Sequence, residues 1–473
     1  MSFQTDLFIN GKYVKSAKGE TITIINPNDD TVVSNKIQVA GEQDVDNAVK
    51  AAKAAFPAWK VTSGAKRAAM MLKFADLLEK NVDRLAHLES SAMGQPISVA
   101  KKFILGPAAV WRYYAGYAGK IAGESYPPDE DGQYKIVQYE PLGVCAGICA
   151  WNGSHILAAW KLAPALAVGN VCILKSSEKS PIALAQYGEL LNEAGFPPGV
   201  VNIVAGAGPT GALLASHMDI AKIALTGSAT AGRAVQVAAA KSNLKRVTLE
   251  LGGKSPAVIF DDADIGNAVF HTSEGFLRNS GQICNASSRV LVQEGIAPEY
   301  IKTVKTAFEK AAEAMGDQSL AETKFGPLAD KKQFDRVMGF LDDAKKQGIE
   351  VLTGGGRKGE KGTFSNVYTD EIFGPVVSVR TFKTEEEAIQ LANDTTYGLG
   401  TTIYTSDMPR ALRVASSIEA GTVSINSAFA TSVQTPFGGW KASGYGRESG
   451  VEGLKTYCQA KTIHINMTLP AKK

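Results

Sequence analysis

The chain has 473 residues, enough for about three domains of ordinary size. Its 50 basic and 47 acidic residues leave a net charge of only +3, which excludes the broad basic surface that nucleic acids or anionic membranes require. An apolar fraction of 45% is typical of a globular protein and excludes a disordered or fibrous chain.

The cysteines and the N-terminus indicate a compartment. Five cysteines at irregular spacing favour a reducing environment over a disulfide framework. Cys145 and Cys149 have no second pair nearby, so we expect no metal site. Residues 1–7 lack the basic and apolar parts of a secretion signal, and no apolar run reaches the roughly 18 residues of a membrane span. These features predict a cytoplasmic protein.

Short strands and turns fill the first 40 residues, including a hairpin over 7–14 with Asn10-Gly11 at its tip. Two amphipathic helices follow, and their apolar faces are expected to pack in the core. These faces comprise Val45, Ala48, Val49, Ala52 and Phe56 in the first helix, and Ala68, Leu72, Ala75 and Leu78 in the second.

From residue 142 onward, apolar β-branched runs alternate with helical stretches. The strands are expected at 142–149, 171–174, 201–204 and 222–226, with helices at roughly 156–167, 181–194, 209–217 and 230–240. A second series has strands near 257–260, 289–293, 376–382, 401–404 and 422–425. The pattern predicts two parallel sheets covered by helices, each in its own α/β domain.

Two pieces belong to neither domain: a hairpin over 126–140 and a lone strand over 461–466. Both are marginal by themselves in water. They become stable if they pair with each other or with a neighbouring subunit. We therefore expect a homo-oligomer, either a dimer or a tetramer.

Two glycine-rich turns are candidates for binding a dinucleotide. Gly206–Gly211 is a literal G-x-G-x-x-G between a strand and a helix, but Pro209 removes one backbone N–H and no acid follows about 20 residues later. Thr226-Gly227-Ser228 stands between a strand and the next helix, whose free N–H groups suit a pyrophosphate. Either turn could be purely structural.

The strand over 171–174 leads into Lys175 and Glu178. A carboxylate at the carboxyl edge of a sheet can accept both hydroxyls of the adenosine ribose, which favours NAD over NADP. The alternative is a solvated surface pair, which is the commoner situation for lysine and glutamate.

Cys284 lies in a polar turn that Gly281 makes sharp, and we expect this turn to separate two helical stretches. A cysteine is a nucleophile only as its thiolate, and most free cysteines are small buried hydrophobes instead. Glu250 occurs in a strand, where glutamate is depleted, and could activate water. Asn152 follows the first strand of the sheet and could donate to an oxyanion.

Glu250 and Cys284 stand in stretches that resemble the aldehyde dehydrogenase superfamily in order and spacing, and the resemblance covers essentially the whole chain. The matching stretches are Ala158–Asn170, Leu249–Pro256, Gly281–Cys284, Glu371–Pro375, Pro436–Gly439 and Gly444–Glu448. The resemblance implies an α/β fold with a Rossmann-like cofactor domain (1–118 and 142–250) and a second α/β catalytic domain (251–443). The implied fold also includes a small β element for oligomerisation (119–141 and 444–473).

The resemblance also implies oxidation of an aldehyde to its acid through a cysteine thiohemiacetal and thioester, with NAD as cofactor and NADP as a weaker alternative. Cys284 would be the nucleophile, Glu250 the general base, and Asn152 with the Cys284 N–H the oxyanion hole. Lys161 and Glu448 would relay protons behind Glu250. Cofactor contacts would come from Ile148, Cys149, Ala150, Trp151, Lys175, Glu178, Gly208, Thr226, Gly227, Ser228, Leu251, Glu371 and Phe373. Among these, Glu371 and Phe373 would hold the nicotinamide ribose and ring, and the Gly206–Gly211 turn would lie near adenine.

The chain departs from the family where Gly153 replaces an aromatic residue, Ala150 a proline, and Thr431 an aromatic residue. These changes predict a wider, more polar pocket that accepts bulky or aromatic aldehydes. The residues expected to line it are Gly153, His155, Trp160, Ile283, Asn285, Thr431 and Phe437. His155 could equally be a cap or a packing residue.

Two other functions compete with aldehyde oxidation in which water releases the acid from the enzyme. Enzymes of the superfamily that transfer the acyl group to CoA, such as CoA-acylating semialdehyde dehydrogenases, generally lack the general-base glutamate, whereas Glu250 is present here. A silent binding or structural homologue would not need Cys284, Glu250 and Asn152 together. Both alternatives are therefore disfavoured.

Overall fold

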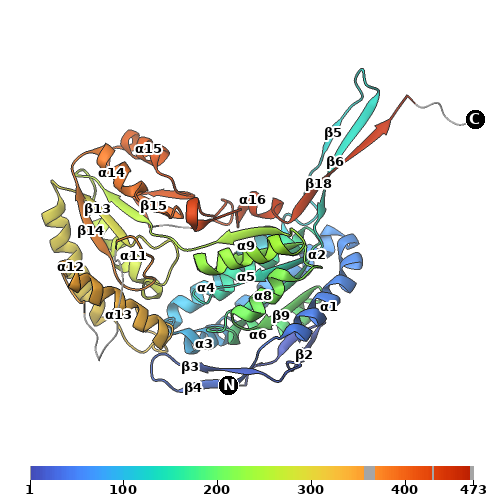
Figure 1. Cartoon of the computed structure of the whole chain (residues 1–473), viewed down its shortest axis with the longest axis horizontal. Helices are drawn as coiled ribbons and strands as arrows, with labels where there is room; N and C mark the ends of the chain where they lie inside the picture. The colour runs from blue at the N-terminus through green and yellow to red at the C-terminus, as the bar shows by residue number, and fades with distance from the viewer. Residues whose placement is uncertain (1, 356–367, 429–430, 469–473) are drawn as a thin grey trace, which may run out of the picture.

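The computed structural model describes residues 2–355, 368–428 and 431–468. In this part of the chain, two lobes each enclose a largely parallel sheet, and a β arm projects from the larger lobe and carries the C-terminal strand (Figure 1). The predicted fold class is therefore confirmed.

The larger sheet has eight strands in the order β17-β11-β10-β7-β8-β9-β1-β2. Its five central strands are parallel: β7 (Val144–Ile148), β8 (Val171–Ser176), β9 (Val201–Ala205), β10 (Lys222–Thr226) and β11 (Arg246–Glu250). The strand order reverses between β7 and β10. The loops after these two strands therefore flank the crevice in which open α/β sheets bind their ligands.

Short antiparallel strands close both edges of the larger sheet. At one edge β1 (Leu7–Ile9) and β2 (Lys12–Val14) form the predicted hairpin, and the tip residues Asn10 and Gly11 have φ of 53° and 77°. At the other edge β17 (Gly444–Tyr445) pairs with β11. A separate ribbon consists of β3 (Thr21–Ile25) and β4 (Val32–Gln38).

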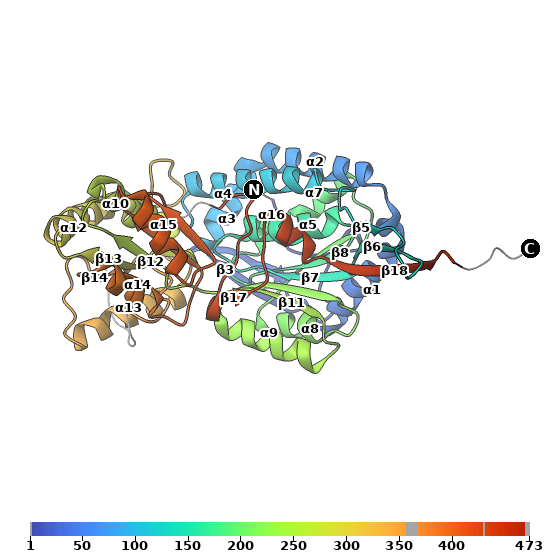
Figure 2. The same cartoon turned by 90° about the horizontal axis from the view of Figure 1, so that it is seen from above.

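Helices cover both faces of this sheet, with α2, α4, α5 and α7 on one side and α8 and α9 on the other (Figure 2). The N-terminal helices are α1 (Glu42–Val61), α2 (Gly64–Lys80), α3 (Val82–Met93) and α4 (Ile97–Ala115). Those between the strands are α5 (Ser154–Ala167), α6 (Ile182–Ala185), α7 (Tyr187–Ala194), α8 (Gly208–Ser216) and α9 (Ala229–Lys241). The sequence predicted neither α3 nor α4, and it merged α6 with α7.

The predicted apolar face of α2 is wrong at Leu72, which is 42% exposed. Met71 and Phe74 are buried instead. The ring of Phe74 packs against the rings of Trp111 and Tyr187, with centroids 4.6 and 5.3 Å away. Burial of this large ring sets the rotation of α2 and turns Leu72 to the surface.

The smaller sheet is fully parallel, in the order β14-β13-β12-β15-β16. Its strands are β12 (Pro256–Ile259), β13 (Arg289–Gln293), β14 (Ser378–Phe382), β15 (Gly400–Tyr404) and β16 (Thr422–Ile425). Its helices are α10 (Ile265–Thr272), α11 (Glu274–Leu277), α12 (Ala297–Glu313), α13 (Lys331–Lys346), α14 (Glu385–Asn393) and α15 (Met408–Ser417). Residues 251–255 join the carboxyl end of β11 to the amino end of β12, so the two sheets meet at that segment.

The arm is a three-stranded antiparallel sheet in the order β18-β6-β5, formed by β5 (Glu124–Tyr126), β6 (Gln133–Pro141) and β18 (Cys458–Asn466). The hairpin and the lone strand therefore pair with each other, the first of the two alternatives that the sequence left open, with β6 and β18 in register along their whole length. A short helix, α16 (Gly450–Lys455), precedes β18.

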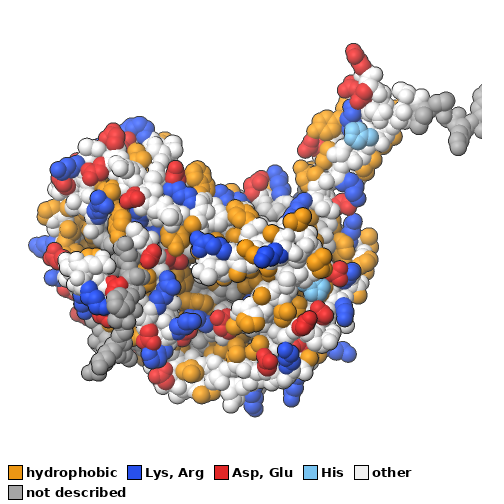
Figure 3. Space-filling view, viewed as in Figure 1, with side chains coloured by type: hydrophobic (Ala, Val, Ile, Leu, Met, Phe, Trp, Pro, Cys, Tyr) orange, Lys and Arg blue, Asp and Glu red, His pale blue; other side chains and the backbone are white. Residues whose placement is uncertain are grey.

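Basic and acidic side chains are interspersed on the face drawn in Figure 3, in keeping with the low net charge. Among residues 2–355, 368–428 and 431–468, no helix combines the length and the apolar character that crossing a membrane demands.

Candidate active site

Cys284 lies in a turn just before β13. The prediction of a helix on both sides is wrong: α11 and a 3-10 turn (Arg278–Gly281) precede Cys284, but a strand follows it. Asn279, Ser280 and Gly281 have φ of 52°, 56° and 72° in succession. A Cβ at Gly281 would lie 2.5 Å from the carbonyl oxygen of Gly374, so only glycine fits this turn.

Buried hydrogen bonds fix the turn from several directions. The Gln282 side chain donates to the Asn279 carbonyl (3.0 Å) and accepts from the Ala329 N–H (3.0 Å). The Ser280 hydroxyl donates to the Gly326 carbonyl at 2.6 Å. The backbone around Cys284 is therefore held in place before any ligand binds.

Asn152, in the loop after β7, reaches the same turn from the larger sheet. Its side-chain Nδ2 donates to the Gln282 carbonyl at 3.1 Å, and its own carbonyl accepts from Asn279 Nδ2 at 3.1 Å. The fold thus brings an amide donor beside the cysteine turn across 130 residues of sequence.

Glu250 ends β11 and is 2% exposed. Neither of its carboxylate oxygens has a hydrogen-bond partner in the part of the chain that the structure describes. Burial raises the pKa of this carboxyl well above its ordinary value, and the negative charge of Glu448 raises it further. A buried carboxyl with free oxygens is suited to exchange protons with water or with a thiol.

The Cys284 thiol is only partly buried, yet its surroundings hold its proton. Loss of hydration raises its pKa to about 12, and the carboxyls of Glu371 and Glu250 add to the increase. Backbone hydrogen bonds from Asn285 and Cys284 act in the opposite direction. The resting sulfur is therefore a thiol that needs a nearby proton acceptor.

Lys161 and Glu448 form a buried ion pair behind Glu250. Lys161 Nζ donates to Glu448 Oε1 at 2.8 Å and to Thr226 Oγ1 at 2.7 Å. Glu448 Oε2 has no partner among the described residues. The charges of the pair act on Glu250, and Lys161 ties the pair to Thr226 at the end of β10, beside the crevice.

The crevice between the β7 and β10 loops suits the pyrophosphate of a dinucleotide. The predicted residues Ile148–Trp151 follow β7, and Thr226–Ser228 follow β10. The Ser228 hydroxyl caps α9 by accepting the Ala231 N–H at 3.2 Å. The remaining N–H groups and the positive end of this helix fit a bound phosphate. The second candidate turn begins α8 at Gly208, where a Cβ would meet open space.

Lys175 and Glu178 stand at the carboxyl end of β8. The buried Lys175 ammonium donates to the carbonyls of Gly206 and Ser176, the latter at 2.9 Å, which leaves one of its three protons for a ligand. Glu178 is exposed and accepts from the Ser177 hydroxyl at 3.3 Å. These residues fit the hydroxyls of an adenosine ribose.

Glu371 and Phe373 approach from the smaller lobe. Glu371 Oε1 accepts the Gly253 N–H at 3.1 Å, and a Cβ at Gly252 would lie 2.0 Å from Glu371 Oε2. Burial raises the Glu371 pKa to about 7. The Phe373 ring stands edge-on to that of Trp151, with centroids 5.3 Å apart. The predicted cofactor residues from both lobes therefore meet. Leu251, between Glu250 and Gly252, is buried, and its N–H donates to the Ser443 carbonyl at 2.9 Å.

The model of the Aldehyde dehydrogenase family matches residues 13–463. The chain belongs to this family. An aldehyde dehydrogenase of Emericella nidulans is 43% identical, over 98% of this chain and 95% of that protein. The NAD+ complex of an aldehyde dehydrogenase from Bacillus cereus is 38% identical with a TM-score of 0.94, over 98% and 97% of the two chains. The indole-3-acetaldehyde dehydrogenase of P. syringae, bound to NAD+ and IAA, is 36% identical with a TM-score of 0.94 and the same coverage. The present aldehyde dehydrogenase is accordingly an oxidoreductase that acts on aldehydes.

The residues expected to line its substrate pocket occupy different environments. Trp160 and Phe437 are buried with ring centroids 5.0 Å apart, and Ile283 and Asn285 flank Cys284 half-buried. Thr431 is exposed. A Cβ at Gly153 would lie 3.2 Å from Ile156 Cγ2 and 3.6 Å from the Phe103 ring. His155 is only 1% exposed, and its Nδ1 hydrogen-bonds the Tyr187 hydroxyl at 2.7 Å. This burial fits the packing role that the sequence left open for His155.

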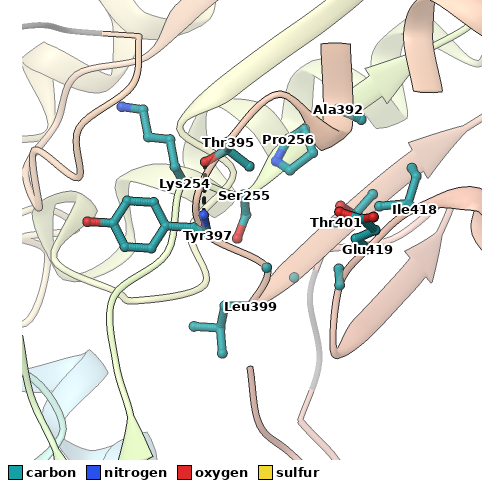
Figure 4. A pocket seen from close by; sticks show the side chains of 13 residues that line it. Lys254, Ser255, Pro256, Ala392, Thr395, Tyr397, Leu399, Thr401, Ile418 and Glu419 are labelled. Atoms are coloured by element: carbon teal, nitrogen blue, oxygen red, sulfur yellow. Dashed lines mark hydrogen bonds between the residues drawn. The ribbon is translucent and has the colours of Figure 1, made fainter. Parts of the chain in front are cut away.

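A small cavity in the smaller lobe lies apart from Cys284 and Asn152. Lys254 and Tyr397 extend to one side of it, and Thr401, Ile418 and Glu419 line the other (Figure 4). The Ser255 and Thr401 hydroxyls are buried there without hydrogen-bond partners in the described ranges. None of the predicted catalytic side chains lines this cavity.

The sequence did not point to Gln95, Asn279 or the backbone contact of Gln282 as parts of the active site of this aldehyde dehydrogenase. Gln95 Nε2 donates to Asn279 Oδ1 at 3.2 Å, which extends the support of the cysteine turn to the segment between α3 and α4. No local pattern marks such residues, because their partners lie more than a hundred positions away.

Proposed function

We propose that this aldehyde dehydrogenase oxidises bulky or aromatic aldehydes to carboxylic acids through a covalent intermediate on Cys284, with NAD as cofactor. The observation that carries the mechanism is the buried Glu250, whose two oxygens have no hydrogen-bond partner among the described residues and whose charge acts on the Cys284 thiol. Asn152 supplies an amide donor beside the same turn.

The first step needs a thiolate. Glu250 in its ionised form accepts the Cys284 proton, and the sulfur then adds to the aldehyde carbon, which turns the carbonyl oxygen into an alkoxide. The Asn152 amide and the Cys284 N–H donate to that oxygen. One such donor is typically worth about 2.7–4 kcal/mol in the transition state.

When bound, NAD supplies the acceptor for the hydride that the thiohemiacetal carbon gives up. Cys284 then carries an acyl group as a thioester. Glu250 takes a proton from a water molecule, the water oxygen bonds to the acyl carbon, and the C–S bond breaks to release the acid and the Cys284 thiolate. The Lys161–Glu448 pair offers a route by which the Glu250 proton leaves the site.

The choice of NAD over NADP rests on Glu178. A carboxylate there is suited to accept both ribose hydroxyls and would repel a 2′-phosphate. The uncommitted proton of Lys175 supports the same ribose.

The proposed substrate class rests on Gly153. Glycine at this position keeps an aromatic side chain out of the region beside Asn152, because Phe103 and Ile156 lie so close that even a Cβ would be 3.2 Å from Ile156 Cγ2. The similar P. syringae enzyme is named for indole-3-acetaldehyde, which is itself a bulky aromatic aldehyde. That likeness supports a pocket of comparable size.

NADH absorbance with a panel of aldehydes tests the proposal. We expect NADH formation without added CoA, faster turnover with NAD than with NADP, and no turnover in Cys284→Ser at unchanged folding. An absolute requirement for CoA would support the acyl-transfer alternative. Turnover that survives in Cys284→Ser would rule out the covalent mechanism.

A further inference from the structure

Beneath the first turn of α5 lies a buried polar cluster that the reaction above does not use. It joins α3, α5 and α7 and comprises Glu89, Ser154, His155, Ser180 and Tyr187, which are between 0% and 3% exposed. The cluster directly follows Asn152 in the chain, since Ser154 and His155 are the first two residues of α5.

One branch of the cluster reaches the backbone next to Asn152. The Glu89 carboxyl hydrogen-bonds Ser154, whose hydroxyl is 2.7 Å from that of Ser180. Both serine hydroxyls lie within reach of the Trp151 carbonyl, at 3.4 and 3.3 Å. Each serine has one proton, so one hydroxyl donates to the other and the second donates to the carbonyl.

The second branch runs through His155. Burial raises the pKa of Tyr187 well above its ordinary value, so its hydroxyl keeps its proton and donates to His155 Nδ1 at 2.7 Å. Burial also lowers the His155 pKa to about 3, so the ring is neutral and carries a single proton. His155 Nε2 lies 4.0 Å from Glu89 Oε2, beyond hydrogen-bond distance, and neither buried atom has a hydrogen-bond partner in the part of the chain described.

We propose that Glu89, Ser154, His155 and Tyr187 position Asn152 as the oxyanion donor, with Glu89 standing between the two branches. Gly153 explains why such a support is needed. Its backbone has φ of −157° and ψ of 49°, and it has no side chain that could pack and fix the turn between Asn152 and α5. Without a side chain at Gly153, the polar cluster is left to hold the donor. This inference rests on the proposed role of Asn152.

Tyr187→Phe and Tyr300→Phe form a matched pair for the test. Each variant removes one fully buried hydroxyl that hydrogen-bonds a side chain. The partner of Tyr300 is Thr272 Oγ1, at 2.6 Å in the core of the smaller lobe. We expect Tyr187→Phe to lower kcat by at least about tenfold, short of the roughly 100- to 1000-fold loss when an oxyanion donor is deleted. The KM of Tyr187→Phe for NAD should equal that of the parent. Tyr300→Phe should lower Tm by a similar amount as Tyr187→Phe but keep the kcat of the parent.

A second pair tests the link through Glu89. Glu89→Gln keeps one donor for Ser154 and one acceptor for His155, so kcat should stay within about twofold of the parent, whereas Glu89→Leu should lose at least about tenfold. The alkylation rate of Cys284 by iodoacetamide should be the same in all folded variants, because the nucleophile is not touched.

Unchanged kcat in folded Glu89→Leu, or an equal loss in Tyr300→Phe and Tyr187→Phe, would overturn the inference. If Tyr187→Phe does not fold, the comparison of Glu89→Gln with Glu89→Leu tests the inference alone. Equal kcat values in these two variants would then contradict the inference. A parent enzyme that oxidises no aldehyde would instead refute the proposed function.

Discussion

At the reactive sulfur, two carboxyls and the loss of hydration oppose ionisation, and only backbone N–H groups favour it. Catalytic cysteines usually owe their reactivity to positive surroundings. Here the thiol remains protonated until a base takes its proton. A protonated thiol avoids the reactions with oxidants that a permanent thiolate would undergo, and in the proposed mechanism the thiolate forms only when Glu250 takes the proton.

Glu371 should therefore control the ionisation of Cys284 in the enzyme without cofactor. The Glu371 pKa is about 7, so above that pH its negative charge holds the Cys284 pKa high. Glu371→Gln removes this charge and should shift the midpoint of alkylation by iodoacetamide downward by about one pH unit. A midpoint that stays in place would contradict the assignment. Glu178→Gln, an exposed glutamate at the end of β8, is the matched control and should leave it unchanged.

Gly153 should set the size of the aldehyde that the enzyme accepts. In Gly153→Phe the new side chain crowds Phe103 and Ile156, since even a Cβ at this position would lie 3.2 Å from Ile156 Cγ2. We expect kcat/KM for benzaldehyde-type substrates to fall by at least about tenfold relative to short aliphatic aldehydes. Gly153→Ala, which adds only the Cβ, should cause a smaller change in the same direction. Equal effects of Gly153→Phe on both substrate types would show that position 153 does not border the aldehyde.

Between α3 and α5, the buried Glu89 should make stability depend on pH. Burial raises the folded-state pKa of Glu89 to about 8 from an ordinary 4.5. The groups that face it are His155, Tyr187, Ser154 and Cys149; the first two are neutral, and the pKa of the Cys149 thiol is raised to about 12. No cation therefore compensates a charge on Glu89.

Between pH 4.5 and about 8, the Glu89 carboxyl ionises in the unfolded chain but stays protonated in the folded protein. The contribution of Glu89 to the free energy of unfolding is therefore complete below pH 4.5 and is lost as the pH rises to about 8. Glu89→Gln does not titrate and should escape this loss, so the Tm of the variant relative to the parent should increase between pH 5 and pH 8. Glu313→Gln, on the exposed side of α12, serves as the control. A Tm difference that is flat across this range would mean that Glu89 is not held protonated.

Whole elements were easier to predict from the sequence than their contacts. The strand Lys222–Thr226 was predicted to the residue, because a short apolar run bounded by turns has one buried arrangement in a parallel sheet. Leu72 was placed on the wrong face, since the rotation of α2 depends on Phe74 meeting Trp111 and Tyr187. The environment of His155 depends on Glu89 and Tyr187, two residues far away in the sequence, and no local pattern reveals such partners.

Across the molecule, the active site depends on how two sheets are joined. The larger sheet supplies Asn152, Lys161 and Glu250 near its carboxyl edge, and Cys284 stands just before the amino end of β13 in the smaller sheet. The linker 251–255 continues directly from Glu250 into β12. A change in the angle between the lobes would therefore separate the Cys284 thiol from Glu250 and Asn152, the base and the oxyanion donor that we propose.

The arm of β5, β6 and β18 should hold subunits together. Three strands that project from the body have little core of their own, and exposed hydrophobic side chains gather on them (Figure 3). Tyr126, Ile465 and Met467 are 48%, 40% and 61% exposed.

A homodimer or homotetramer would bury these side chains, so light scattering should give two or four times the mass of 50.0 kDa. The double variant Ile465→Asp, Met467→Asp should shift the mass toward that of one chain, while Val61→Asp, on the exposed end of α1, should not. A parent protein that is monomeric at micromolar concentration would refute this role for the arm.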